Sequence, residues 1–274
     1  TLLRLRYSQP SHNLESCPQL NSRAKTAEAV EESEEDSWRS EAAYDYVDAL
    51  SPGDLAWEFL RRNTEYRRSY DEFLQAGDNT EELTREFHPD GGCDFPADPS
   101  ASAIVSPVFW DAHFDPSIVV LGKIPTAHTP PSLDDFIRAQ AINGIDGEML
   151  RLQIRGEIFD ASLRDGAGSL AAMVLLDELT PDRLSTLARF WAALAGKTVP
   201  PDPRITRSRQ KRAREMLRVL DGRASGATYR AIADAVFPKH DHDAASWVGS
   251  AIRETTIRLA RDGAKLVQGG YRSI

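Results

Sequence analysis

Charge is distributed very unevenly along this chain of 274 residues. From Arg204 to the end there are fifteen Lys or Arg and seven Asp or Glu, a net charge of +8, whereas the first 203 residues carry a net charge of −17. Because attraction to phosphate acts over about 8 Å in physiological salt, the local charge of the last segment matters more than the total of −9. Taken alone, this charge fits a DNA-binding domain and an ordinary helical domain with a solvated basic face equally well.

The composition is that of a globular protein that can fill a core, with 41% hydrophobic and 27% charged residues. No stretch approaches the roughly 18 consecutive apolar residues that a membrane span needs, so we expect no membrane partner. The chain starts at Thr1 without a basic-then-apolar signal segment. Cys17 and Cys93 have neither disulfide-framework nor metal-ligand spacing. A cytoplasmic location is therefore expected.

The first part of the chain is predicted to hold an acidic leader and a small domain. Residues 1–40 are predicted to be disordered, since the acidic run ending at Asp36 repels itself and buries little apolar surface. Residues 41–123 are predicted to form a small domain of helices and strands. A helical pattern starts at Pro52, with Ser51 or Asp54 as its cap, and is interrupted at 61–63, which indicates two helices or a bend.

Two β-prone runs, 103–110 and 117–122, complete this N-terminal domain and are expected to pair as an antiparallel unit. The proline-rich stretch 124–132 is predicted to be the linker to a second domain, 133–274.

The second domain is predicted to begin with short strands at 148–154, 157–163 and 171–176, the first two joined in a hairpin near Arg155-Gly156. A helix over about 181–195 follows, with one apolar stripe that is expected to face the core: Leu184, Leu187, Ala188, Trp191 and Leu194. With a helix-turn-helix unit of three helices at about 207–274, the fold class is α+β in two domains.

The first helix of that unit is predicted over 208–220, with Ala213, Met216, Leu217 and Leu220 on one face. Cations crowd its beginning, where they oppose the helix dipole and so do not serve helix stability. Contact with DNA phosphate is a physical reason for them. The candidates are Arg207, Arg209, Lys211 and Arg212, with Arg214 beside them.

Two more helices are predicted over 229–237 and 244–261, capped by Thr228 and Asp243. In the last helix an inward stripe is expected at Val248, Ile252, Thr255 and Leu259, with Trp247 as a core anchor. Another side presents small or hydrogen-bonding residues and then an arginine, as a helix that reads a DNA groove requires: Ser246, Ser250 and Arg253. A plain three-helix bundle would show a similar pattern. The tail 265–274 is predicted to form a β-wing from which Arg272 reaches a phosphate.

Patterns for catalysis are weak, and we expect neither an enzyme nor a cofactor. The run 240–243, His-Asp-His-Asp, has metal-ligand types, but it lacks a third distant ligand and is better explained as a polar turn. The glycines at 166 and 168 are not followed by GK[ST], and no serine lies in a GxSxG motif.

The end of the chain, LRVLDGRASGATYRAIADAVF and, after Trp247, RLARDGAKLVQGGYRSI, resembles the RovC-like DNA-binding domain family of bacterial transcription factors. LDELTPDRLSTLARFWAALAGK resembles the leading half of the same domain. AYDYVDALSPGDLAWEFLRRNTEYRRSY is similar to the transcriptional regulator-like domain that often precedes it, except that the usual RNP is here Arg62-Asn63-Thr64. That departure is expected to affect a bend more than function.

The resemblance implies promoter activation by direct DNA binding, as in activators of type VI secretion genes and FseA-like activators of excision of integrative and conjugative elements. It implies DNA contacts for Arg230 and for the helix that holds Arg253 and Arg258. Expected partners are double-stranded promoter DNA, RNA polymerase, an antiactivator protein and further copies of the chain. The alternative is an antiactivator or interaction module that binds another regulator without DNA. The predicted DNA-binding residues are Arg207, Arg209, Lys211, Arg212, Thr228, Tyr229, Arg230, Ser246, Ser250, Arg253, Arg258 and Arg272.

Overall fold

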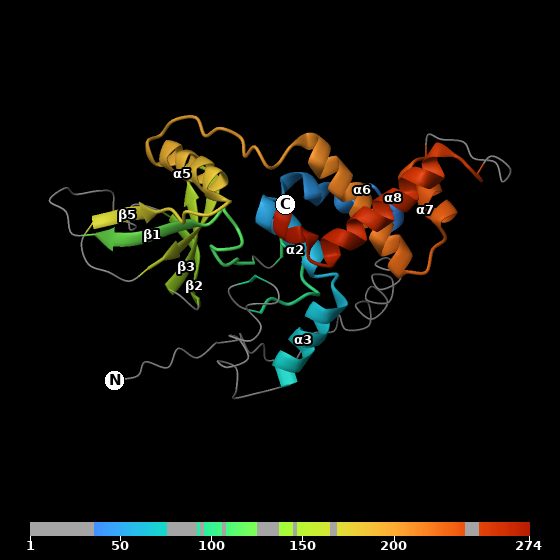
Figure 1. Ribbon diagram of the computed structural model, residues 1–274, viewed down its shortest axis with the longest axis horizontal. Helices are drawn as coiled ribbons and strands as arrows, with labels where there is room; N and C mark the ends of the chain where they lie inside the picture. The colour runs from blue at the N-terminus through green and yellow to red at the C-terminus, as the bar shows by residue number, and fades with distance from the viewer. Residues whose placement is uncertain are drawn as a thin grey trace, which may run out of the picture. The chain divides into compact units, whose positions relative to one another are not determined.

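The computed structural model describes residues 36–75, 92–93, 96–105, 108–124, 137–144, 147–164, 169–238 and 247–274. These residues form helices and a five-stranded sheet, which confirms the α+β class (Figure 1). Most of the predicted leader, residues 1–35, lies outside the described residues. Its end was predicted wrongly, because Trp38, in the short 3-10 helix η1 (Ser37–Arg39), is only 1% exposed. The indole supplies the apolar surface that the preceding acidic run lacks.

The first helices are η2 (Ala42–Ala49), α2 (Pro52–Leu60) and α3 (Thr64–Gln75). Of the two predicted caps, Ser51 is the one that caps α2, and it does so in a capping box with Asp54. The interruption in the helical pattern is a turn in which the Asn63 side-chain oxygen accepts hydrogen bonds from the amides of Glu65 and Tyr66. The expectation of two helices is confirmed.

The sheet consists of β1 (Val119–Ile124), β2 (Ile137–Gly144), β3 (Gly147–Ile154), β4 (Glu157–Leu163) and β5 (Ser169–Met173), in the order β2-β3-β4-β1-β5. The predicted hairpin joins β3 and β4, and its two-residue turn has positive φ at both Arg155 and Gly156, as a type I′ turn requires. Strand β1 lies between β4, to which it is parallel, and β5, to which it is antiparallel.

The predicted pairing of 103–110 with 117–122 is wrong, because 103–105 is a turn and the strand starts at Val119 and pairs with later strands. An isolated hairpin is marginal in water, whereas a place inside a larger sheet lets Val119 and Leu121 bury. The five strands therefore unite segments from both sides of the predicted linker 124–132, which lies outside the described residues except for Ile124.

Helix α5 (Thr180–Leu194) covers one face of the sheet (Figure 1). Phe190 packs edge-on against Phe159 of β4, with ring centroids 5.4 Å apart, and Ala193 lies in the same core. The expected inward stripe is wrong in phase. Leu184 and Trp191 are 53% and 55% exposed, because the helix turns Phe190 and Ala193 toward the sheet and leaves Leu187 and Leu194 at the margin.

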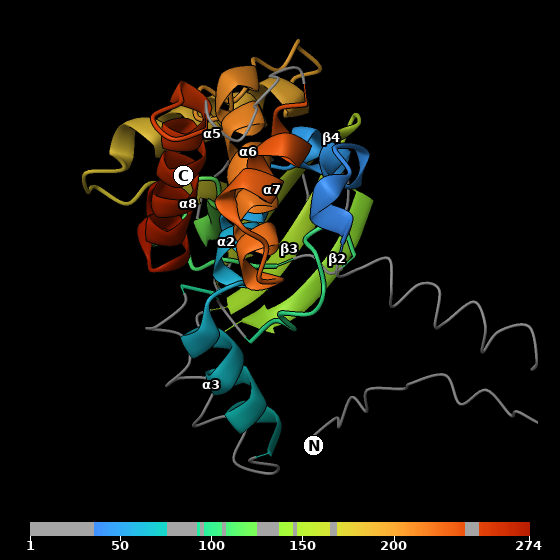
Figure 2. The same ribbon diagram turned by 90° about the vertical axis from the view of Figure 1, so that its right-hand side faces the viewer.

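A second core lies among the helices from the two ends of the chain. Helices α6 (Arg207–Ala224), α7 (Tyr229–Val236) and α8 (Ala251–Val267) lie together, with α2 and η2 against them (Figure 2). Fully buried members of this core are Trp38, Trp57, Phe59, Leu217, Ile232 and Leu259. Residues near the start of the described chain thus share a core with its last helices.

A buried ion-pair network joins α2 to α6. The Arg62 guanidinium donates to both carboxylate oxygens of Asp221, at 2.7 Å each, and Tyr44 Oη donates to the same carboxylate at 2.6 Å. Arg62 also pairs with Glu58, whose side chain is fully buried, at 2.9 Å. Burial opposes ionisation of Asp221, but the hydrogen bonds from Arg62 and Tyr44 and the positive charges of Arg62 and Arg61 together outweigh it and hold the pKa of Asp221 below its ordinary value. The pKa of Glu58 is lowered in the same way by Arg61 and Arg62.

Candidate nucleic-acid interface

Each helix of the three-helix unit begins at a capping side chain. The hydroxyl oxygens of Thr206, Thr228 and Ser250 accept hydrogen bonds from the backbone amides three residues ahead of them, which fixes the starts of α6, α7 and α8. The prediction for Thr228 is confirmed. Ser250 was expected within the groove-reading side of a helix and is instead its cap.

The last helix starts later than predicted, at Ala251 instead of Ala244. Gly249 has a φ of 88°, which no helix tolerates, so the helix cannot extend through it. The cap expected at Asp243 and the candidate Ser246 lie outside the described residues.

The late start changes the buried face of α8. Val248, expected in the inward stripe, is 81% exposed, because it precedes the helix and does not share its phase. The buried residues of α8 are Thr256, Leu259, Ala260 and Gly263. Trp247, expected as a core anchor, is only half-buried.

The cations at the start of α6 are exposed, as a phosphate-binding face requires. The side chains of Arg207 and Lys211 form no hydrogen bond or ion pair with any residue that the structure describes. Arg209 donates to the Arg204 carbonyl oxygen at 2.8 Å, and Arg212 pairs with Asp262 of α8 at 2.6 Å. The first two turns of α6 therefore present four cations, two of which have no side-chain partner among the described residues.

Two further cations of α6 point into the protein. Arg214 is 14% exposed and pairs with Asp45 and Asp48 of η2. Arg218 is buried and donates to the carbonyl oxygens of Trp38, Arg39 and Ala235. Their charges are used to attach the N-terminal helices, so they do not belong to the exposed face.

Helix α8 extends the basic surface. Arg258 is exposed, and its side chain has no hydrogen bond or ion pair within the described part of the chain. Arg261, one helical turn further, is 64% exposed and shares Asp262 with Arg212, at 3.4 Å and 2.6 Å. Arg261 was not predicted, although its spacing from Arg258 places the two on the same side of a helix. We call five of the exposed cations of α6 and α8 the basic patch: Arg207, Lys211, Arg212, Arg258 and Arg261.

The remaining predicted residues surround α7 and the ends of α8. Thr228 is exposed and Tyr229 half-buried, with the Arg223 guanidinium 4.6 Å from the centre of its ring. Arg230 is half-buried. Arg253 is 39% exposed and pairs with Glu254 at 2.8 Å, on the surface at the first turn of α8.

The expected β-wing at 265–274 is wrong. Helix α8 continues to Val267, Gly269 ends it with a φ of 118°, and a 3-10 helix, η5 (Gly270–Ser273), follows. Tyr271 is buried beside Trp110, with ring centroids 5.9 Å apart, and this contact holds the tail against the core. Arg272 accordingly lies over the ring of Phe114, at 5.3 Å, and not on a wing.

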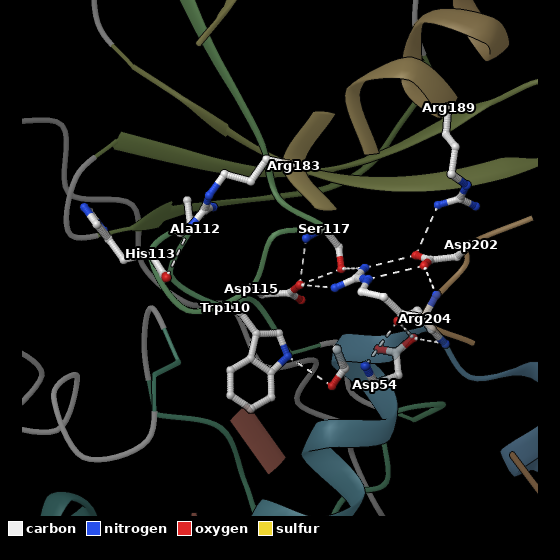
Figure 3. A network of polar contacts seen from close by, with 12 residues as sticks. Asp54, Trp110, Ala112, His113, Asp115, Ser117, Arg183, Arg189, Asp202 and Arg204 are labelled. Atoms are coloured by element: carbon white, nitrogen blue, oxygen red, sulfur yellow. Dashed lines mark hydrogen bonds and ion pairs between the residues drawn. The ribbon is translucent and has the colours of Figure 1, made fainter. Parts of the chain in front are cut away.

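The segment before α6 is fixed by a polar network (Figure 3). Arg204 donates to Asp202 at 2.9 Å, to Asp115 at 3.3 Å and to Ser117 Oγ at 2.6 Å. Arg189 of α5 pairs with Asp202 at 3.4 Å. Burial disfavours the Asp202 carboxylate, but the hydrogen bonds from Arg204 and the positive charges of Arg204 and Arg189 together prevail and lower its pKa. The start of α6, and with it Arg207 and Lys211, is thereby held in place.

Two family models match the chain. Residues 173–274 match the family described as "T6SS, Transcription factor, DNA binding domain", and residues 37–96 match the "Proteobacterial transcriptional regulator-like domain". The chain is a transcriptional regulator with a DNA-binding domain. All five cations of the basic patch lie inside the first match, and η2, α2 and α3 lie inside the second. No curated protein matches the regulator.

Other kinds of site receive no support from the described part of the regulator. No cluster of His, Cys, Asp or Glu there has the arrangement of a metal site. The run 240–243, His-Asp-His-Asp, lies outside the described residues. Among the same residues, no helix combines the length and apolar character that crossing a bilayer demands.

Proposed function

We propose that the regulator activates transcription by binding promoter duplex DNA with the basic patch. The observation that carries the proposal is the exposure of five cations on the adjacent helices α6 and α8, where Arg207, Lys211 and Arg258 have no internal partner among the described residues. Unpaired cations on a rigid surface are suited to phosphate, since binding releases counterions from DNA without breaking protein contacts.

Base reading is assigned to the first turns of α7 and α8. Thr228, Tyr229 and Arg230 begin α7, and Ser250 and Arg253 begin α8. Helix N-termini attract phosphate and bring side chains close to the groove. The Arg253–Glu254 pair is a surface pair of a kind that contributes about 0–1 kcal/mol, so exchanging Glu254 for guanine or phosphate costs little.

The wider role follows from the resemblance of the chain to activators. We propose that the regulator acts in the cytoplasm, contacts RNA polymerase through its N-terminal helices, binds DNA as a homo-oligomer and catalyses no reaction. Its target genes are proposed to control the excision and transfer of an integrative and conjugative element, or secretion.

Titration of labelled duplex by fluorescence anisotropy tests the proposal. The full chain is titrated with its own upstream region and with an unrelated duplex, at about 50 and 200 mM salt, where each phosphate contact contributes about 0.9 to the slope of log affinity against log salt. The triple variant Arg207→Gln, Lys211→Gln, Arg258→Gln should lower that slope by about 2.7. Arg68→Gln is the matched control, since Arg68 is 65% exposed on α3, away from the patch. Equal slopes for the triple variant and the control would contradict the proposal.

A second variant tests the reading residues separately. Arg253→Ala should weaken specific binding by about 1–3 kcal/mol and leave binding to the unrelated duplex nearly unchanged. If both duplexes are affected alike, Arg253 contacts phosphate and reads no base.

The alternative function, an antiactivator that binds another regulator, is favoured by the excess of acidic residues before Arg204. It predicts no binding of either duplex even at low salt. The same titration therefore separates the two functions.

A further inference from the structure

Helix α5 has apolar residues on two faces but only one face is covered. Leu187 and Leu194 pack at the margin of the sheet core, beside the buried Phe190 and Ala193. On the outer side, Leu184 and Trp191 are 53% and 55% exposed, and Ala188 between them is exposed. Steps of four and three residues place these side chains in one stripe along the helix. We call Leu184, Ala188 and Trp191 the outer stripe.

The outer stripe is not the usual surface of a helix that covers a sheet, whose outer side is polar. The Lys197 ammonium lies 4.2 Å from the centre of the Trp191 ring, and it is the one cation–π contact that this ring makes within the described residues. Exposed Trp and Leu in a row are typical of interfaces, where Trp contributes more binding energy than most side chains.

Charge at the two ends of α5 indicates what covers the stripe. Glu178 is exposed just before the helix and forms no hydrogen bond or ion pair through its side chain with the described residues. Lys197 is exposed just after the helix, on the side of Trp191. The stripe thus has a negative end and a positive end, and such a surface is complementary to a copy of itself turned end to end.

We propose that a second copy of the chain binds here, with the two α5 helices antiparallel and the two-fold axis near Ala188. The register that packs Leu184 against Trp191 of the partner copy also brings Glu178 to Lys197 of the partner copy. Both contacts then occur twice, as an isologous interface requires. Ala188 at the axis is small enough to let the helices approach closely.

The contact is small, because a helix of 15 residues is about 22 Å long. Such an interface belongs to the small, weak class, and we expect a dimer in roughly the micromolar range. Two linked DNA-binding units would then gain affinity on paired half-sites by raised effective concentration. The outer stripe of α5 is thus the surface of self-association, and its contacts form without DNA.

Analytical ultracentrifugation of the full chain without DNA tests it. Trp191→Ala should weaken the dimer at least tenfold and Leu184→Ala several-fold. Leu74→Ala, the same substitution at a residue of α3 that is 61% exposed, should leave it unchanged. Glu178→Lys should weaken the dimer, and the double variant Glu178→Lys, Lys197→Glu should restore it. A chain that stays monomeric up to about 100 µM, above the range expected for this interface size, overturns the proposal, and so does a double variant that fails to recover.

Disulfide trapping tests the axis. In a Cys17→Ser background, Ala188→Cys should give a cross-linked dimer on mild oxidation, whereas Ala224→Cys, at the exposed end of α6, should not. Equal cross-linking of the two variants would place the axis elsewhere and refute the arrangement. Anisotropy on a single half-site separates this failure from that of the proposed function, since a monomeric Trp191→Ala chain should still bind it.

Discussion

Replacing Asp221 by Asn tests whether the buried ion pair holds the N-terminal helices on the DNA-binding helices. The substitution keeps the shape of the side chain and its bond from Tyr44 but removes the charge opposite Arg62, which is 11% exposed. Breaking a buried pair costs about 3–5 kcal/mol because it strands the remaining charge. Asp221 is 27% exposed, and Arg62 keeps its ion pair with Glu58 at 2.9 Å. We therefore expect a smaller loss of stability than for a fully buried pair, about 2–3 kcal/mol.

Urea denaturation followed by tryptophan fluorescence measures this loss, since Trp38 and Trp57 are buried in the same core. The pH dependence gives an independent check. The pKa values of Asp221 and Glu58 are lowered by folding, so the unfolded chain takes up protons first as the pH falls. Their contribution to stability is present above the ordinary carboxyl pKa and is lost as the pH falls toward the folded values. Below about pH 5, the unmodified chain should therefore lose stability more steeply than Asp221→Asn.

Glu254→Gln is the control, because it breaks the exposed Arg253–Glu254 pair and should cost less than about 1 kcal/mol. The reasoning is refuted if Asp221→Asn costs no more than this control and the two pH profiles coincide.

Three further substitutions probe the packing and the helix ends. Gly222→Ala places a methyl group 2.9 Å from Ile232 and 3.1 Å from the Trp38 ring and should cost about 1–3 kcal/mol in urea denaturation; a gain in stability would show that these neighbours yield freely. Ser250→Ala removes the cap of α8 and should lower stability by about 1 kcal/mol and speed hydrogen exchange of the Arg253 amide, from which the Ser250 hydroxyl accepts a hydrogen bond. Unchanged exchange at Arg253 would contradict the role of Ser250 as the cap. Trp247→Ala removes a half-buried ring and should lower stability by about 1–2 kcal/mol. A thermal melt measures the loss, and a loss of about 3–5 kcal/mol would instead indicate a fully buried ring.

Features that depend on a few neighbouring residues were predictable from the sequence. The capping box at Ser51, the cap at Thr228 and the tight turn at Arg155-Gly156 are set by local hydrogen bonds and backbone preferences. The apolar face of α6, with Ala213, Met216 and Leu217 buried, follows from helical spacing alone.

Features that depend on distant partners were not predictable. Residues of strand β1 pair with residues more than 40 positions further along the chain, and periodicity says nothing about which neighbours a strand will find. The shape of the sheet decides which side of α5 faces it. The sequence alone does not, since the helix has two apolar sides and either could be buried. The candidate site shows the same division: the cations of α6 were identifiable, whereas the loss of Arg214 and Arg218 to the interior depends on η2 and Trp38.

The core shared by the two ends of the chain also affects synthesis on the ribosome. Trp38 and Tyr44 emerge early, but Gly222, beside the Trp38 ring, and Asp221, which accepts a hydrogen bond from Tyr44, emerge more than 170 residues later. At about 5–20 residues per second, this core cannot close for roughly ten seconds or more, whereas the strands from 119 to 173 can pair in the interval. A chain that stops before α6 leaves Trp38 and Tyr44 without their partners Gly222 and Asp221, so we expect truncated products to be recognised by chaperones and proteases before they can compete for promoters.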